Sequence, residues 1–335
     1  MHALIQAWTW RQGGLTVRRM CEIAGVSRAG YYRHWRASEP RREETELCDV
    51  IQRLALGNRH YGYRRIGALL CREGWCVNHK RVNRLMREDN LLCLRRKAFV
   101  PATTDSAHRF RIYPNLARRL IPMAINQLWV ADITYVRLAE AFAYLAVILD
   151  AYSRRVVGWS LADHLRTALA LDALEMALSG REITAGALIH HSDRGVQYAS
   201  GDYVARLDAI GILPSMSRLG CPYDNAMAES FMKTLKTEEV EGQAYRNITE
   251  ARDNIGAFIE QVYNRQRLHS ALDYRSPEEF EIDQPQAWLA VGQSCLQAQL
   301  VPNFPVSHQG YSPMVSLLQP ENPESQDRSI HFMTQ

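Results

Sequence analysis

Hydrophobic positions between residues 127 and 263 follow strand-like runs first and helical spacing afterwards. Five short apolar runs predict strands at Leu128–Val136, Ala143–Leu149, Arg155–Leu161, Ala187–His190 and Leu213–Met216. Stretches with helical spacing predict helices at Thr167–Ser179, Gly201–Ile210, Asn225–Val240 and Thr249–Tyr263. Three consecutive strands followed by alternating helices and strands are typical of an α/β fold with a mixed sheet.

The first 40 residues predict a pair of helices joined by a tight turn. Thr16 caps the first helix and Ser27 caps the second, with Ala-Gly-Val between them. This pattern predicts a helix-turn-helix DNA-binding region over residues 1–40, in which Arg28 and Arg33 of the second helix reach bases or phosphates. Turns of this sequence also occur in helical bundles that bind no DNA.

A second helical unit is predicted over residues 41–94. Its helices are expected at Glu43–Leu56, Tyr63–Arg72 and His79–Glu88. Lys80, Arg81 and Arg84 lie largely on one side of the last helix, where we expect them to bind phosphates without reading sequence.

Two further segments lack any sustained period. Residues 95–125 combine basic side chains with Pro101, Pro114 and Pro122, which predicts a basic linker before a domain over residues 126–282. Residues 283–335 contain prolines and glutamines without a pattern, and we expect a poorly ordered tail.

Charge is divided unevenly along the chain. Residues 1–121 contain 24 Lys and Arg against 10 Asp and Glu, a balance of +14, whereas the remainder carries −10. A basic half followed by an acidic half is the pattern of a nucleic-acid-binding region joined to another activity.

Two classes of protein are disfavoured by composition. The longest apolar run, Ala141–Leu149, is too short to span a bilayer, and the N-terminus lacks the basic and small-residue pattern of a secretory signal. Seven cysteines without regular spacing suggest reduced thiols, so we expect a cytoplasmic protein.

Three carboxylates stand out from these predicted elements. Asp132 interrupts a buried strand, Asp193 follows the end of another strand, and Glu229 lies on a helix. Each one alone is more often a capping or surface residue, but a carboxylate within an apolar strand is costly unless it is paired or bound to metal. Mg²⁺ prefers such hard oxygen ligands, and two ions can hold the attacking and leaving oxygens of a phosphodiester.

The contexts of these acids resemble those of a known enzyme family. They are Trp-Val-Ala-Asp132-Ile-Thr-Tyr, His-His-Ser-Asp193-Arg-Gly and Asn-Ala-Met-Ala-Glu229-Ser-Phe, with 35 residues between Asp193 and Glu229. This pattern resembles the DDE transposases of bacterial insertion sequences, in particular the second-frame product of a two-frame transposase, and the retroviral integrase core. The motifs Tyr-Asn-Arg-Gln-Arg-Leu-His and Ser-Pro-Glu-Glu-Phe resemble the closing segment of that family, and the similarity extends from about Leu15 to Phe280.

The resemblance implies a ribonuclease H-like catalytic core preceded by all-α helix-turn-helix regions. It implies that Asp132, Asp193 and Glu229 bind two Mg²⁺ ions, with Mn²⁺ as a substitute, and catalyse DNA cleavage and strand transfer. Lys236, seven residues after the glutamate, matches a DNA-contacting position. We also expect DNA contacts from Lys233, on the same helix face, and from Arg194, beside the second aspartate.

The implied partners are the terminal inverted repeats of an element, a target DNA, further copies of the chain and a first-frame protein. Two alternatives stay open from the sequence. One is a DNA-binding regulator without autonomous catalysis, and the other is a ribonuclease H-like nuclease that does not join strands.

Overall fold

The computed structural model describes Ile5 and residues 16–38, 42–93, 110–219 and 221–283 of this 335-residue chain. The predicted tail, apart from Asp283, and the first part of the predicted linker lie outside these residues. No helix in the described ranges is long and apolar enough to cross a membrane.

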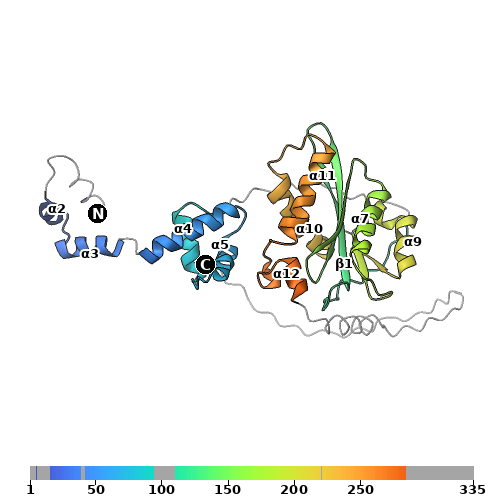
Figure 1. The fold of residues 1–335 in the computed structure, drawn as a ribbon, viewed down its shortest axis with the longest axis horizontal. Coiled ribbons are helices and arrows are strands. Elements are labelled where there is room, and N and C mark those ends of the chain that lie inside the picture. The colour runs from blue at the N-terminus through green and yellow to red at the C-terminus, as the bar shows by residue number, and fades with distance from the viewer. Residues whose placement is uncertain (1–4, 6–15, 39–41, 94–109, 220, 284–335) are drawn as a thin grey trace, which may run out of the picture. The chain divides into compact units, whose positions relative to one another are not determined.

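A five-stranded mixed sheet forms the centre of residues 126–282, as the alternation of the sequence predicts (Figure 1). Its strands are β1 (Leu128–Arg137), β2 (Phe142–Asp150), β3 (Val156–Ala162), β4 (Ile189–Ser192) and β5 (Leu213–Met216). The strand order is β3-β2-β1-β4-β5, in which the first three strands are antiparallel and β4 and β5 run parallel to β1. This arrangement is the ribonuclease H-like fold that the resemblance implies.

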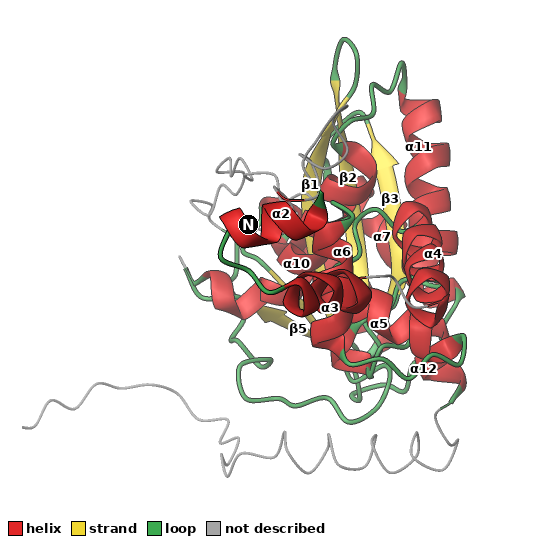
Figure 2. Ribbon diagram, turned by 90° about the vertical axis from the view of Figure 1, so that its left-hand side faces the viewer, coloured by secondary structure: helices red, strands yellow, loops and turns green. Residues whose placement is uncertain are grey.

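Helices cover both faces of the sheet (Figures 1 and 2). Helices α7 (Thr167–Ser179) and α9 (Gly201–Ile210) pack on one face, where Trp129, Ala131 and Ile148 join a hydrophobic cluster with residues of both helices. Helices α10 (Ala226–Leu235) and α11 (Ile248–Ala257) contact the strands from the other face. Because side chains alternate along β1, its even-numbered residues from Leu128 to Asp132 point away from the α7 cluster and toward α10.

Two predicted helices end in a wider π-helical turn. Helix α10 continues as the π-helical segment Lys236–Val240, and α11 continues as Phe258–Tyr263. The sequence therefore predicted the extent of both helices but not the change from α-helical to π-helical hydrogen bonding. Such π-helical turns often occur at functional sites. The four-residue helix α8 (Val196–Ala199) and helix α12 (Pro277–Ile282), which has a capping box from Ser276 and Glu279, were not predicted.

The helices of the N-terminal third follow the predicted caps. Helix α2 (Val17–Ile23) has Thr16 as its N-cap, and the Ser27 hydroxyl accepts a hydrogen bond from the amide of Gly30 at the start of α3 (Arg28–Ser38). Helices α4 (Arg42–Gly57), α5 (Tyr63–Arg72) and α6 (His79–Glu88) share a hydrophobic cluster that also contains Leu268.

Long-range hydrogen bonds connect these helices with the closing motif. The Tyr61 hydroxyl accepts a bond of 3.0 Å from the amide of Leu268, and Arg65 donates to the Leu268 carbonyl at 2.8 Å. Arg72 forms a two-pronged ion pair with Glu279. Residues about 200 positions apart in the sequence therefore belong to one packed structure.

Candidate active site

The first two predicted carboxylates lie at equivalent positions on adjacent parallel strands. Strand β1 pairs with β4 so that Val130 is opposite His191. Asp132 and Asp193 each lie two residues beyond this pair, Asp132 within β1 and Asp193 directly after β4. The register of these adjacent strands therefore brings the two acids together.

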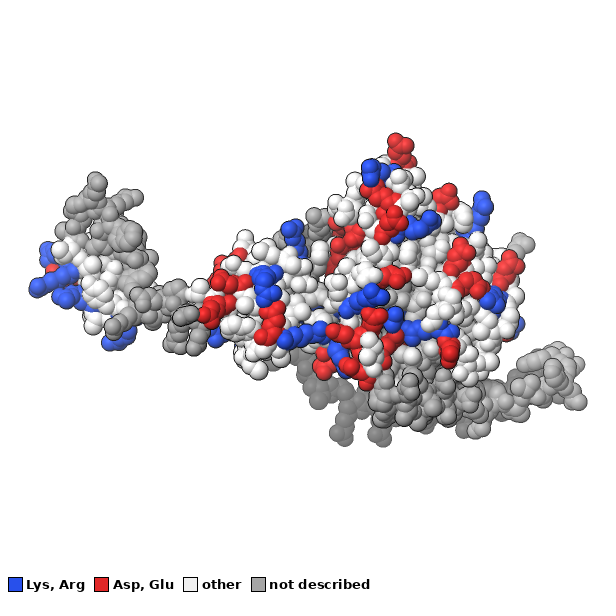
Figure 3. All heavy atoms as spheres, in the orientation of Figure 1, with Lys and Arg blue, Asp and Glu red and all other residues white. Residues whose placement is uncertain are grey.

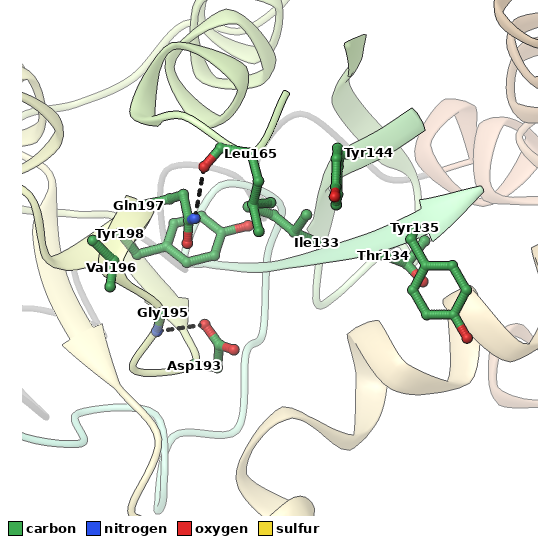
Figure 4. Close-up of a pocket in the computed structure, with 10 residues that line it drawn as sticks. All are labelled: Ile133, Thr134, Tyr135, Tyr144, Leu165, Asp193, Gly195, Val196, Gln197 and Tyr198. Carbon is green, nitrogen blue, oxygen red and sulfur yellow. Dashed lines mark hydrogen bonds between the residues drawn. The ribbon is translucent and has the colours of Figure 1, made fainter. Parts of the chain in front are cut away.

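Local hydrogen bonds orient both aspartates. The Asp132 carboxylate accepts a bond of 2.9 Å from the amide of Ile133, and Asp193 accepts one of 2.9 Å from the amide of Gly195. Figure 4 shows Asp193 at the turn that leads into α8, with the bond to Gly195 closing that turn. The Gly195 position leaves little space, since a β-carbon there would lie 2.9 Å from an Asp193 oxygen.

Glu229 comes from the first turn of α10, on the face of the sheet toward which Asp132 points. The start of this helix is attached to β1 by Asn225, whose buried side-chain amide donates a 3.0 Å bond to the carbonyl of Ala131. That carbonyl belongs to the residue just before Asp132, so Asn225 fixes where α10 begins relative to the first carboxylate. The Glu229 side chain itself is exposed.

The charges of Asp193 and Glu229 act on Asp132. The pKa of Asp132 is raised to about 7, first by burial, then by repulsion from Asp193 and more weakly from Glu229. Lys236 is the cation that opposes this shift. Partial burial also raises the pKa of Glu229. Such accumulated negative charge is what a divalent cation compensates.

The donor set suits a hard cation, although the acids are not gathered tightly. They are carboxylates, the ligand type that Mg²⁺ favours. In the described ranges, no three His, Cys, Asp or Glu side chains lie close enough together to hold one ion. Joint binding of one ion by the three carboxylates therefore requires a change of side-chain rotamer. Glu229 can make such a change because its side chain is exposed.

The predicted lysines of α10 have different environments. Lys236 is half-buried, with its ammonium group 4.5 Å from the ring centroid of Tyr135, and burial lowers its pKa. It therefore lies at the carboxylate site, at the start of the π-helical turn. Lys233 is exposed.

The other predicted DNA contacts are spread over the chain. The Nε atom of Arg194 donates to the Ser217 carbonyl at 2.8 Å and thereby ties the Asp193 loop to the end of β5. Arg28 and Arg33 are exposed on α3, and Lys80 is exposed on α6.

Two predicted arginines of α6 are already engaged with acids. Arg84 pairs with Glu44 at 2.7 Å and with Glu88 at 3.0 Å, and Arg81 lies 3.6 Å from Glu44. Their charge is partly neutralised within the protein, so Lys80 is the stronger phosphate-binding candidate on this helix.

Other titratable groups near the site are buried and hydrogen-bonded within the protein. His190 bonds to the Tyr203 hydroxyl at 2.9 Å and His191 to Ser215 and Ser217, and burial lowers the pKa of these histidines to about 3 and about 4. Asp150 is fully buried and accepts backbone hydrogen bonds from Tyr152 and Ser153 in the turn after β2 and from Asn126 before β1.

A hollow beside Asp193 contains a residue that the sequence did not single out. Its lining includes Tyr135 from β1, Leu165 from the loop that precedes α7, and Gln197 and Tyr198 from helix α8 (Figure 4). The buried hydroxyl of Tyr198 has no hydrogen-bond partner in the described part of the chain, and its pKa is raised by burial, Tyr203 and the two aspartates. Helix α8, with four residues, gives no periodic signal that could have pointed to this tyrosine.

Family models match two parts of the chain. Two models described as integrase core domain match residues 123–222 and 210–277, and a model described as HTH-like domain matches residues 41–99.

Individual relatives are similar over most of the chain. A 31 kDa protein of insertion element IS600 from Shigella sonnei is 42% identical over 266 residues, which cover 78% of this chain and 97% of the relative. The transposase InsF for insertion sequence IS3A from Escherichia coli K12 is 36% identical over 277 residues, covering 81% and 95%. Among solved structures, the HTLV-2 integrase catalytic core domain in complex with magnesium matches with a TM-score of 0.36 and 15% identity, over 47% of this chain and 96% of that one.

Proposed function

Since this chain belongs to the insertion-sequence transposases with an integrase core domain, we propose that it cleaves DNA at the ends of its element and transfers the exposed strands to a new site. The catalytic residues in this proposal are Asp132, Asp193 and Glu229. The observation that carries it is the strand pairing of Val130 with His191, which brings Asp132 and Asp193 together, with the Glu229 helix attached beside them through Asn225. Burial, then Asp193 and more weakly Glu229, raise the pKa of Asp132 in keeping with this arrangement. A structural role for this charge cluster would be costly, because like charges repel and burial disfavours ionisation.

The metal in this proposal is a pair of Mg²⁺ ions, with Mn²⁺ as a substitute. Asp132 in β1 and Asp193 after β4 would bind them, and Glu229 of α10 would complete the ligand set. When bound, the ions supply activation of water and stabilisation of the charge that develops on the phosphodiester oxygens.

The remaining residues bind and position DNA in this scheme. Asn225 keeps the start of α10 against β1, and Lys236 places a positive charge beside the acids. Lys233 and Arg194 contact the strand near the site, while Arg28, Arg33, Lys80, Arg81 and Arg84 bind DNA from the helical regions. Two element ends must be processed together, so we infer a multimer assembled on DNA.

The proposal is tested by strand joining in cells. The chain is expressed beside a plasmid that carries the DNA flanking its gene, and junctions between element ends are amplified. Wild-type protein is expected to give junctions, and Glu229→Gln, which keeps the shape of the side chain but loses its charge, is expected to give none.

Other outcomes select among the alternative functions. Junctions from Glu229→Gln would contradict the site assignment. Nicked ends without junctions would favour a plain nuclease. If the wild type gives no nicks and no junctions, the result would favour a regulator or a chain that requires its upstream reading frame. A fusion with that frame is the matched comparison.

A further inference from the structure

A second concave region runs along another face of α10, away from Glu229. It consists of two adjoining hollows that share Arg154, Met227 and Ser230. We call it the arginine groove, after the arginines that line it. These are Arg65, Arg118, Arg154, Arg218 and Arg267.

Arg267 is the most deeply placed of these side chains. It is 5% exposed and forms a buried ion pair with Glu238, which lies in the π-helical turn after α10. Its Nε atom nevertheless has no hydrogen-bond partner in the described part of the chain, and the same holds for Nε2 of His269, another lining residue. Two buried nitrogens therefore remain unsatisfied at this hollow, and such atoms are costly without an acceptor.

Arg154 occupies the point where the two hollows meet. Its backbone is left-handed, with φ of 64°, a conformation that disfavours every residue with a β-carbon and that glycine adopts without strain. No ion pair to Arg154, Arg65 or Arg118 is present among the described residues. Burial lowers the pKa of the Arg154 guanidinium, which shows that this charge is held partly out of water.

The charge of the groove is not balanced within the protein. Five arginines face three acids: Asp224 is paired with Arg218, Glu238 is paired with Arg267, and the charge of the buried Asp150 acts on Arg154. Elsewhere, Figure 3 shows acidic and basic side chains interspersed over the visible face. A groove with surplus arginines spread over two hollows fits a chain of anions better than a single small one, because guanidinium groups bind phosphates in two-pronged geometry.

We propose that the arginine groove binds the phosphodiester backbone of a DNA strand. This contact is separate from the carboxylate site and from the lysines and arginines that the sequence singled out. The inference rests on the proposed function only in that the chain acts on DNA. Its arginines come from α5, the segment before β1, the β2–β3 turn, the loop after β5 and the closing motif. A strand in the groove therefore also contacts the helical unit through Arg65.

Arg154→Gly is the decisive variant, because it removes the guanidinium and also relieves the left-handed backbone. The melting temperature of the full chain is expected to stay equal or rise. Affinity for a DNA duplex of fixed length is expected to fall about tenfold at low salt, and the slope of log affinity against log salt to decrease by about one. Arg118→Gln, in the other hollow, is expected to reduce the slope similarly, while Arg154→Lys retains it.

The matched control is Arg206→Gln, which removes a half-buried arginine of α9 that pairs with Glu175. Its DNA affinity and salt slope are expected to equal those of the wild type. Unchanged affinity and slope in both Arg154→Gly and Arg118→Gln would overturn the inference. Two results together would also overturn it in favour of a small-anion site. The first is that millimolar inorganic phosphate raises the melting temperature of the wild type but not that of Arg154→Gly. The second is that the two proteins have the same DNA affinity.

Failure of the proposed function gives a different result. Glu229→Gln is expected to bind DNA as the wild type does. Strand joining retained by Glu229→Gln, together with the expected loss of DNA affinity in Arg154→Gly, would remove the catalytic assignment and leave the groove inference intact. Absence of DNA binding by the wild type would overturn both.

Discussion

At the scale of single residues, Asp132 is held where a lone carboxylate is unstable. Its pKa of about 7 means that burial and the neighbouring acids penalise its charged form. If Asp132 has the proposed catalytic role, function and stability oppose each other at this position in the metal-free protein.

Asp132→Asn is expected to stabilise the metal-free chain. At pH 8 in EDTA, loss of the penalised charge should raise the free energy of unfolding by about 1 kcal/mol or more. Millimolar Mg²⁺ should raise the melting temperature of the wild type but much less that of the variant, because only the native site binds the ion. A variant that melts lower than the wild type in EDTA would show that the Asp132 charge is not penalised.

A buried histidine predicts acid sensitivity. Burial lowers the pKa of His190 to about 3, below its value near 6.5 in the unfolded chain. Between these two pH values the unfolded chain binds a proton at this residue and the folded chain does not. The free energy of unfolding therefore falls as pH decreases below 6.5, by at most about 1.4 kcal/mol per pH unit for this residue. His190→Gln should flatten that slope in chemical denaturation between pH 6.5 and 4.5, and an unchanged slope would contradict this assignment.

At the scale of elements, the approach of α7 to the sheet depends on one glycine. A β-carbon at Gly158 in β3 would lie 2.1 Å from the carbonyl oxygen of Ala173 and 2.8 Å from the β-carbon of Ala177. Neither neighbour is a flexible side-chain end, so the helix would have to shift.

Gly158→Ala is expected to destabilise the fold by about 2 kcal/mol or more, because overpacking moves the helix backbone. The matched control is Gly67→Ala in α5, where a β-carbon would meet nothing within 4 Å. That substitution should stabilise by up to about 1 kcal/mol through helix propensity. Equal melting temperatures of the two variants would contradict this packing.

The active-site elements were predictable to different degrees. Strand β1 and helices α7 and α9 follow strong periodic patterns, and the motifs around Asp132, Asp193 and Glu229 placed the acids on the correct elements. The sequence indicated a mixed sheet but not its strand order, which arises from long-range pairing. The π-helical turn at Lys236 has no local sequence signal. It replaces i→i+4 backbone hydrogen bonds by i→i+5 bonds, and this change does not require a different type of side chain.

At the scale of the whole molecule, the described part of the chain is joined by contacts that no local pattern could predict. The arginine groove combines side chains from positions 65, 118, 154, 218 and 267. The Ser276–Glu279 capping box, by contrast, was present in the sequence as Ser-Pro-Glu-Glu before helix α12 and could have been predicted.

Tyr61→Phe tests the coupling between the helical unit and the closing motif. The Tyr61 hydroxyl accepts from the Leu268 amide, and both residues are buried, so its removal leaves a buried donor unsatisfied. The expected loss is about 1–3 kcal/mol in the free energy of unfolding. Hydrogen exchange should show faster exchange both in α5 and around Leu268, and a change confined to α5 would contradict the coupling.

The central claim is that Asp132, Asp193 and Glu229 form one metal-dependent site for DNA cleavage and strand transfer. Its most direct test is strand joining by the purified full chain on a labelled element end, with Mg²⁺ and with EDTA, for the wild type and Glu229→Gln at matched DNA occupancy. The account predicts joined product only from the wild type with Mg²⁺. Joined product from Glu229→Gln, or from the wild type in EDTA, would contradict it.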